Sequence, residues 1–371
     1  AKQDGHKEDD VAGAGNGYVA MFDQTGALLK TLISQGLLNS PWGLTLAPAG
    51  FGPFGGTLLV GNFGDGTINA FDPVSGKPLG TLADLNGKPI VIPGLWSLNF
   101  GSGARSEDTG TLYFTAGIGD GPDNANNLES HGLLGSIQGP PVFTSVNILN
   151  GASQLAGPIS QNTWVTIKGS GLSPTTGTWK VTGPELPTQV NGVGVTVAGT
   201  AVPVSFVSNS QINFLVQNAG GLGSAAIQVT SNGLTSATVQ ATMTSLSPGF
   251  FPLGTQNGKS YIAATHADGS LLGPAGLVAG ATTTPAKAGE TIVLYGTGFG
   301  ATISGQPALP VNPVIVIDGI VADVKFAGLT GPGLYQFNVT VPATASVGDD
   351  LVVALLVNSE TQAAIYLSVG Q

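Results

Sequence analysis

The chain has 371 residues, of which 42% are hydrophobic and only 9% charged, and its formal net charge is −10. An acidic chain repels nucleic acid and anionic membranes, so nucleic-acid binding and membrane insertion are excluded as expected functions. The 58 glycines and 24 prolines interrupt nearly every window long enough for a helix, and the absence of cysteine excludes disulfides and thiolate metal sites. We therefore expect an all-β protein of two or three domains.

The beginning of the chain shows no signal peptide and no apolar run that could cross a membrane. It opens abruptly at AKQDGHKEDD, which we interpret as a mature or trimmed product whose export signal has been removed. A surface built mainly from Ser, Thr, Asn, Gln and Gly suits an extracellular setting better than the cytosol. The expected location is therefore secreted, either extracellular or on the cell surface.

The first third of the chain contains a repeat. GNGYVAMFDQTGALLKTL at residues 15–32 returns as GDGTINAFDPVSGKPLGTL at residues 64–82. Four short strands in each unit, separated by Gly, Asp, Pro and Ser turns, are typical of a β-propeller blade. Half a blade, a whole blade and most of a third are expected in residues 15–38, 39–84 and 92–138. We predict a partial β-propeller over residues 1–138, with about two and a half blades where a closed propeller needs at least four.

A second pair of segments belongs to the same repeat: NSPWGLTLAP at residues 39–48 returns as PGLWSLNFGS at residues 93–102. Trp42 and Trp96 occupy matching positions, and we expect them to pack between blades. The wording of these segments, with VAGAGNGYVAMFD before them and HGLLGSI after them, resembles the C-terminal half of a family of uncharacterised secreted bacterial proteins with propeller-like repeats. The resemblance implies that further blades lie upstream of Ala1, and it implies no catalytic residues.

After QGPPV the repeat changes. TWVTIKGSGL at residues 163–172 is answered by ETIVLYGTGF at residues 290–299, and SQINFLV is answered by YQFNVTV. Valines at positions 193, 195 and 197 alternate, and so do Val202, Val204 and Phe206, as in the strands of a β-sandwich. We predict two immunoglobulin-like domains, over residues 139–246 and 247–371, with Trp164 in the first core.

The wording of this second region resembles the C-terminal immunoglobulin-like domains of many secreted acidobacterial proteins. The segments that carry the resemblance are PTQVNGVGVTVAGTAVPVSFVSNSQINFLVQ and PAKAGETIVLYGTGFG. Such domains generally serve as spacers or adhesion modules, and the resemblance implies that role here.

Acidic side chains in IGDGPDNANN form the candidate metal site. Asp120, Asp123 and Asn124 could supply oxygen ligands to calcium, although their spacing is not that of an EF-hand loop. The alternative is ordinary hairpin chemistry, since Asp-Gly supplies the positive φ that a tight turn needs. Calcium is the cofactor that this loop would hold.

Other motifs carry weaker signals. The three histidines, His6, His131 and His266, lie in different regions, and His266 in THADG is expected in a turn. GTGFG at residues 296–300 has no helix after it, as a nucleotide loop requires, so we expect a bulge at a strand end there. No catalytic residue is assigned.

The sequence favours a non-enzymatic, extracellular structural or adhesive protein. Two alternatives stay open: a propeller-type lyase or hydrolase acting on polysaccharide, and a carbohydrate-binding surface protein. A truncated propeller should leave open strand edges near residues 18–22 and 133–138, which either upstream blades or a second copy of the chain would cover. A homo-oligomer is therefore expected, and head-to-tail pairing that does not close would produce a filament.

Overall fold

The structure is a computed structural model that describes residues 11–84, 86–102, 109–118, 131–302 and 306–371. These residues form strands and two short 3-10 helices, η1 (Gly52–Phe54) and η3 (Ser145–Asn147), so the all-β prediction is confirmed. No helix in this part of the chain is long and apolar enough to cross a membrane. The chain divides into two compact units, residues 1–142 with 170–174 and residues 143–169 with 175–371.

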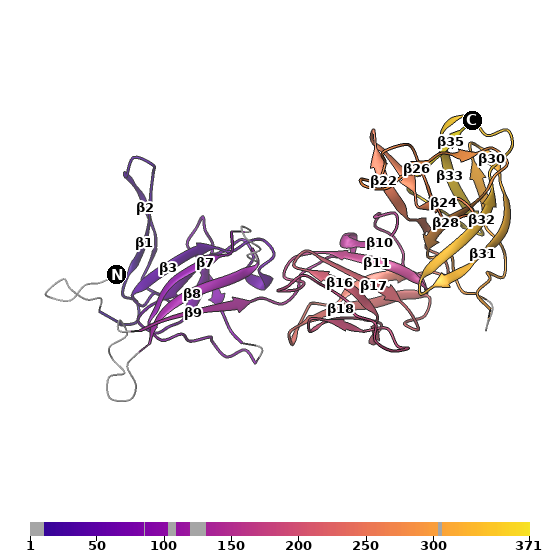
Figure 1. Cartoon of the computed structure of the whole chain (residues 1–371). Coiled ribbons are helices and arrows are strands. Elements are labelled where there is room, and N and C mark those ends of the chain that lie inside the picture. Colours follow the sequence, from indigo (N-terminus) through magenta and orange to yellow (C-terminus); the bar gives the residue numbers. More distant parts are fainter. Residues whose placement is uncertain (1–10, 85, 103–108, 119–130, 303–305) are drawn as a thin grey trace. The chain divides into compact units, whose positions relative to one another are not determined.

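The first unit contains three antiparallel sheets of two, four and three strands, coloured indigo to magenta in Figure 1. We call them the two-, four- and three-stranded sheets. Their strands are β1 (Tyr18–Phe22) and β2 (Leu28–Ser34); β3 (Pro41–Leu46), β4 (Leu58–Asn62), β5 (Ile68–Phe71) and β6 (Pro78–Thr81); and β7 (Leu95–Phe100), β8 (Thr111–Ile118) and β9 (His131–Gln138). The strands predicted from the repeat are thus confirmed. The described residues do not form a closed propeller, so the propeller assignment stays a prediction.

Aspartate side chains close the hairpins of this unit. In the turn between β5 and β6, Asp72 Oδ1 accepts the backbone N–H groups of Val74 at 3.0 Å and Ser75 at 2.6 Å. These hydrogen bonds, with that of the Ser75 hydroxyl, lower the pKa of Asp72. Gly76 follows with φ +74°. The Asp and Gly of the repeat therefore specify the turn rather than a binding site.

The three sheets pack face to face in chain order. The four-stranded sheet contributes Leu59, Ile68 and Ala70 to a core shared with Leu95, Leu98 and Leu112 of the three-stranded sheet. Its other face carries Val60 and Phe71, which pack on Val19, Ile33 and Leu38. We expected the ends of an open stack to leave only free strand edges. Because the sheets meet through their faces, each end presents an apolar face as well as free strand edges.

Trp42 does not pack between sheets as predicted, because its side chain is 47% exposed. Its ring stacks on that of Phe63, with the two ring centroids 5.3 Å apart. Among the described residues, the preceding sheet contains only β1 and β2. Trp96 is half-buried.

The second unit begins with a sandwich of two sheets, which we call the first sandwich. Five strands form one sheet: β10 (Ile148–Asn150), β11 (Thr163–Lys168), β17 (Gln211–Val216), β16 (Val204–Ser208) and β12 (Gly177–Thr178). Six form the other: β13 (Gln189–Val190), β14 (Val193–Val197), β15 (Thr200–Val202), β18 (Gly223–Ser231), β19 (Leu234–Thr235) and β20 (Val239–Met243).

The alternation predicted for β14 is confirmed, since Val193, Val195 and Val197 are buried. The alternation predicted for AVPVSF is wrong at Phe206. An irregularity between Val204 and Phe206 shifts the register, so that Val207 is buried and Phe206 is only half-buried.

A second sandwich follows, shown in orange and yellow in Figure 1. Its first sheet contains β21 (Gly249–Phe250), β24 (Ala264–Thr265), β25 (Leu271–Leu272), β26 (Thr283–Thr284), β28 (Thr291–Thr297), β31 (Asp323–Gly331) and β32 (Leu334–Thr340). Its second contains β22 (Pro252–Gln256), β23 (Lys259–Ile262), β27 (Ala286–Lys287), β29 (Val314–Ile317), β30 (Ile320–Val321), β33 (Gly348–Leu356), β34 (Ser359–Glu360) and β35 (Tyr366–Gly370). Three short pairs are parallel, and the rest are antiparallel.

Phe337 lies at the centre of the second core, against Phe299 and Phe250. The Tyr335 hydroxyl donates to the Gly300 carbonyl, and burial raises the pKa of Tyr335 to about 12. Tyr335 and Phe337, at the beginning of YQFNVTV, therefore contribute to packing.

Polar contacts join the two sandwiches inside the second unit. The Thr297 hydroxyl accepts the Trp164 backbone N–H at 2.9 Å and donates to the Gly333 carbonyl at 2.8 Å. The Asn150 amide donates to the Ser247 carbonyl at 2.8 Å. Trp164 is thus half-buried at this junction and not in the first core as predicted, because its indole N–H donates to the carbonyl of residue 332.

The glycines of GTGFG lie at the same junction. β28 ends at Thr297 in regular register, so the bulge predicted there is wrong. Gly298 instead adopts φ +78°, and a Cβ at this position would lie 1.9 Å from the Ser247 carbonyl oxygen. Glycine is required here by backbone conformation and by close approach.

Candidate functional site

The residues predicted to hold calcium, Asp120, Asp123 and Asn124, lie outside the described residues, so calcium at that loop stays a prediction. Asp65, in the matching NFGDG segment, is described. Its Oδ1 accepts the backbone N–H and the hydroxyl of Thr67 at 3.0 and 2.6 Å. Within the described ranges, no group of three or more His, Asp or Glu side chains is arranged to hold a metal ion.

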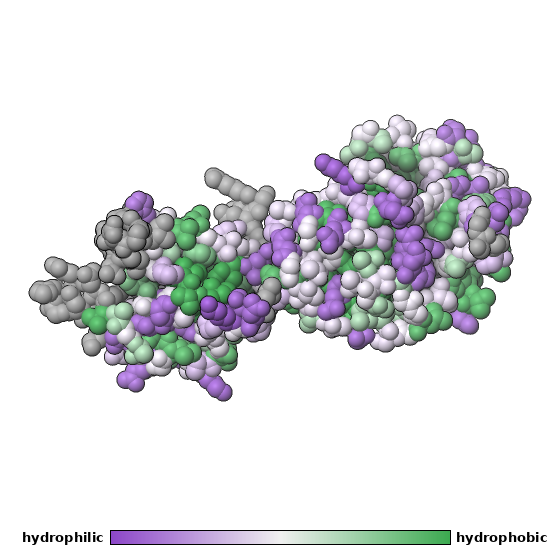
Figure 2. Space-filling model, turned by 90° about the horizontal axis from the view of Figure 1, so that it is seen from below, coloured by the Kyte–Doolittle hydropathy of each residue, from purple (hydrophilic) through white to green (hydrophobic). Residues whose placement is uncertain are grey.

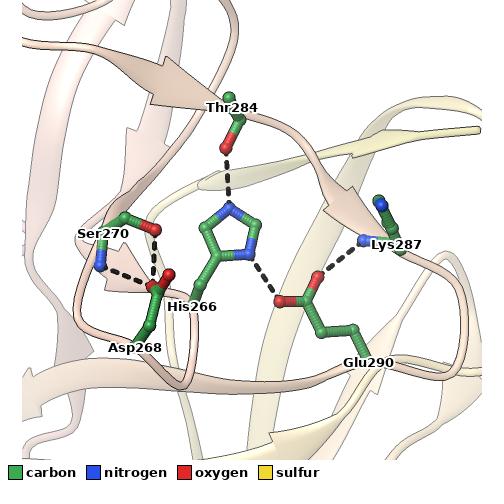
Figure 3. Close-up of polar contacts among 6 residues, drawn as sticks. All are labelled: His266, Asp268, Ser270, Thr284, Lys287 and Glu290. Atoms are coloured by element: carbon green, nitrogen blue, oxygen red, sulfur yellow. Dashed lines mark hydrogen bonds and ion pairs between the residues drawn. The ribbon is translucent and has the colours of Figure 1, made fainter.

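The most organised cluster of polar side chains surrounds His266 in the second sandwich (Figure 3). The Nδ1–H of His266 donates to Glu290 Oε1 at 2.5 Å, and the Thr284 hydroxyl lies 2.8 Å from Nε2. The imidazole and the carboxylate are both largely buried. His266 begins a turn closed by its backbone N–H to Ser270 at 2.9 Å, so the turn predicted for THADG is confirmed.

Neighbouring contacts hold this cluster in place. Glu290 Oε2 accepts the Lys287 backbone N–H at 2.9 Å. Asp268 Oδ1 accepts the Ser270 hydroxyl at 2.6 Å, which lowers the pKa of Asp268. Thr284 is in β26, and Glu290 directly precedes β28. His266 therefore ties one turn to two other segments of the sheet.

The order hydroxyl, imidazole, carboxylate is that of a catalytic triad, and it borders an open depression of about 530 Å³. Catalysis would also require donors aimed at a developing oxyanion. Here the imidazole instead joins Glu290 to Thr284, and the Glu290 carboxylate also accepts the Lys287 backbone N–H. We interpret the cluster as a polar tie, and sequence reasoning missed it because residues 266, 284 and 290 follow no common motif.

Asp350 is a second unusual side chain. It is only 5% exposed, and its Oδ2 has no hydrogen-bond partner among the described residues. Burial, followed by the charges of Asp318 and Asp349, raises the pKa of Asp350 above its ordinary value. The ionised Asp350 carboxylate therefore destabilises the fold at neutral pH.

We expect Asp350→Asn to increase the free energy of unfolding of the second sandwich by about 1 kcal/mol at neutral pH. A raised folded-state pKa means that the carboxyl stabilises the fold while protonated and that this contribution is lost as the pH rises through that pKa. The increase in unfolding free energy caused by Asp350→Asn should therefore be smaller in acid. Urea denaturation at neutral and acidic pH, followed through the amide exchange of β33 in the second sandwich, measures it, with Asp323→Asn at an exposed side chain as control. Equal gains at both pH values would contradict the explanation.

Two aromatic side chains border a further depression of about 280 Å³. Trp164 and Trp179 meet edge to face at 5.5 Å beside Thr166 and Asn213. Aromatic rings with amides nearby can stack on sugars, but Trp164 is already engaged at the junction between sandwiches. In the second repeat, Thr291 takes the place of Trp164.

Comparison with known proteins identifies one domain. Residues 141–256 match the model of the IPT/TIG domain. Two uncharacterised proteins of Acanthamoeba polyphaga mimivirus are 38% identical, over 129 and 125 residues, or 34% and 33% of this chain. The chain spans only 28% and 29% of the length of these relatives.

Similar solved structures include an Escherichia coli adhesin, FdeC, at 13% identity and a TM-score of 0.21, covering 89% of this chain and 96% of that one. Domains 5–6 of the S-layer protein SbsC match at 11% identity and a TM-score of 0.21, covering 62% and 99%. The assignment of a domain type follows from the family match and from the observed strands. The first sandwich is an immunoglobulin-like domain of the IPT/TIG type.

Proposed function

We propose that this protein is a non-enzymatic structural or adhesive protein of the cell exterior, built as a stack of β-sheets followed by immunoglobulin-like domains. The observation that carries the proposal is the open apolar end of the sheet stack. The second unit also supports the proposal. Its buried polar side chains, such as Thr297 and Asn150, join the two sandwiches to each other instead of lining a substrate site.

The open end of the stack exposes apolar side chains. Tyr18, Phe22 and Leu28 of the β1–β2 hairpin are all more than half exposed, and the hairpin projects from the rest of the unit in Figure 1. Leu133 and Leu134 of β9 are exposed at the other end. Figure 2 shows hydrophobic residues gathered on this unit's surface. Such patches are characteristic of surfaces that bind protein.

The free strand edges add to this surface. Among the described strands, β1 pairs with β2 and β9 pairs with β8, so each has a free edge. Free edges and apolar faces together favour pairing with further β-structure. A homo-oligomer forms when a second copy supplies it, and a filament forms when head-to-tail pairing does not close. Upstream blades would cover the same surface within one chain. A carbohydrate partner is less well supported, because Trp164 is engaged elsewhere.

Light scattering and electron microscopy of the purified 371-residue chain test the proposal. We expect association that increases with concentration, and we expect Phe22→Asp to weaken it. Val74→Asp is the matched control, because Val74 is apolar and exposed but lies in the turn after β5. A monodisperse monomer that turns over a polysaccharide, with the loss of turnover in His266→Ala, would contradict the proposal.

A further inference from the structure

The repeat identifies which strands of a full sheet the two-stranded sheet contains. GNGYVAMFD aligns with GDGTINAFD, so β1 corresponds to β5 and β2 to β6. Their packing agrees with the alignment. Val19 packs toward the four-stranded sheet, as its counterpart Ile68 packs toward the three-stranded sheet. The two-stranded sheet is therefore the second half of a four-stranded one.

The missing half would lie on the free edge of β1. β5 pairs with β6 on one side and with β4 on the other, and β4 in turn pairs with β3. β1 pairs with β2 alone among the described strands. On the β2 side, Lys30 Nζ donates to the Val74 carbonyl at 2.5 Å, above the turn between β5 and β6. The free edge of β1 therefore faces the side on which β4 and β3 lie.

Exposure of β3 shows what the missing strands would cover. Leu44 and Leu46 lie opposite Val60 and Leu58 in the register, on the face that packs against the two-stranded sheet. Yet Leu44 is 44% exposed and Leu46 is 62% exposed. β3 therefore presents an apolar face that no strand in the described part of the chain covers.

The next pair of sheets provides the internal control. In the repeat, NSPWGLTLAP aligns with PGLWSLNFGS, so Leu44 corresponds to Leu98 and Leu46 to Phe100. Leu98 is only 5% exposed, and both residues pack against the four-stranded sheet, which has all its strands. The same position of the repeat is thus covered where the preceding sheet is complete and bare where it is not.

We propose that the free edge of β1 accepts two antiparallel strands of this same repeat, equivalent to β4 and β3, which lie over Leu44 and Leu46. The proposal rests on the proposed function, in which the open end of the stack joins further β-structure, and it names that structure. In both larger sheets the two equivalent strands precede the Phe-Asp strand or its counterpart in the sequence. The occupant is therefore a segment of the same polypeptide that precedes β1.

A graft tests this proposal on the full chain. Residues 39–66, which contain β3 and β4, are copied and placed directly ahead of Tyr18 in exchange for residues 1–17, so that the copied Gly66 takes the position of Gly17. The chain has no cysteine, so Leu44→Cys provides one site for maleimide labelling. Leu79→Cys, on exposed β6, is the matched control.

We expect the graft to slow labelling at position 44 by about tenfold or more, because the site becomes buried, and to leave labelling at position 79 unchanged. A second graft carries Leu59→Asp in the copied strand only. Leu59 faces the following sheet in its native place, so this charge should restore fast labelling at position 44. Circular dichroism of each chain verifies that the sheets are folded.

Two outcomes would overturn the proposal. One is equal labelling at position 44 with and without a folded graft. The other is protection of position 44 in the ungrafted, associated chain that equals the protection given by the graft, since a second copy would then cover the site as well as the equivalent strands do. In that case the proposed function stands, because the open end still joins β-structure, whereas a monomeric chain with an active site would remove the function itself.

Discussion

Phe71→Ala should destabilise the four-stranded sheet by about 3 kcal/mol, and Phe22→Ala, at the equivalent position of the repeat, by less than about 0.5 kcal/mol. Phe71 is 2% exposed and packs with Val19, Ile33 and Leu38 of the preceding sheet. Removal of its ring leaves a cavity that the surrounding sheets cannot fill. Phe22 is 59% exposed, so its removal leaves none.

Amide hydrogen exchange of β4 and β5 measures this difference, because global unfolding of a chain with several domains is not a single transition. A loss of about 3 kcal/mol corresponds to exchange more than about a hundredfold faster. Similar costs for the two substitutions, in the isolated 371-residue chain at low concentration, would show that something already covers Phe22.

Phe22 and Phe71 also show how far sequence predicts structure here. The same Phe-Asp pair predicts the same strand and turn in both places, and both form. Burial of the ring could not be predicted from the pair, because it depends on whether another sheet lies in front. The local sequence pattern specifies a strand, whereas the sheets that pack beside that strand determine whether its face is buried.

In the two sandwiches, too, the sequence predicted the strands better than the contacts that those strands make. Alternating valines predicted the buried face of β14, but nothing in AVPVSF signalled the irregularity that buries Val207 in place of Phe206. The polar tie at His266 was missed for a related reason. Its partners Thr284 and Glu290 are brought together by strand pairing, which a search for motifs at fixed spacing does not detect.

Gly298→Ala should have the largest effect on the second unit. Gly298 and Gly289 both adopt φ +78°, a conformation that costs alanine about 1 kcal/mol. A Cβ on Gly289 would have no atom within 4 Å, whereas one on Gly298 would lie 1.9 Å from the Ser247 carbonyl oxygen. Gly289→Ala therefore isolates the conformational cost, and Gly298→Ala adds the clash.

The clash cannot be relieved by a side-chain rotation, because its partner is backbone. Ser247 must move, and it donates its backbone N–H to the Gly298 carbonyl at 2.9 Å and its hydroxyl to the Pro158 carbonyl at 2.7 Å. We expect Gly298→Ala to cost about 3 kcal/mol in total, against about 1 kcal/mol for Gly289→Ala.

Calorimetry of the two variants decides the matter. If the junction transmits stability between the sandwiches, Gly298→Ala should lower the melting temperature of both, whereas Gly289→Ala should affect the second alone. Equal, small shifts for the two variants would mean that the segment at Ser247 is free to move, and that the hydrogen bonds of Thr297, Asn150 and Ser247 do not couple the sandwiches. A structural role for the second unit requires that coupling, because a chain of domains transmits force only where neighbouring domains resist separation.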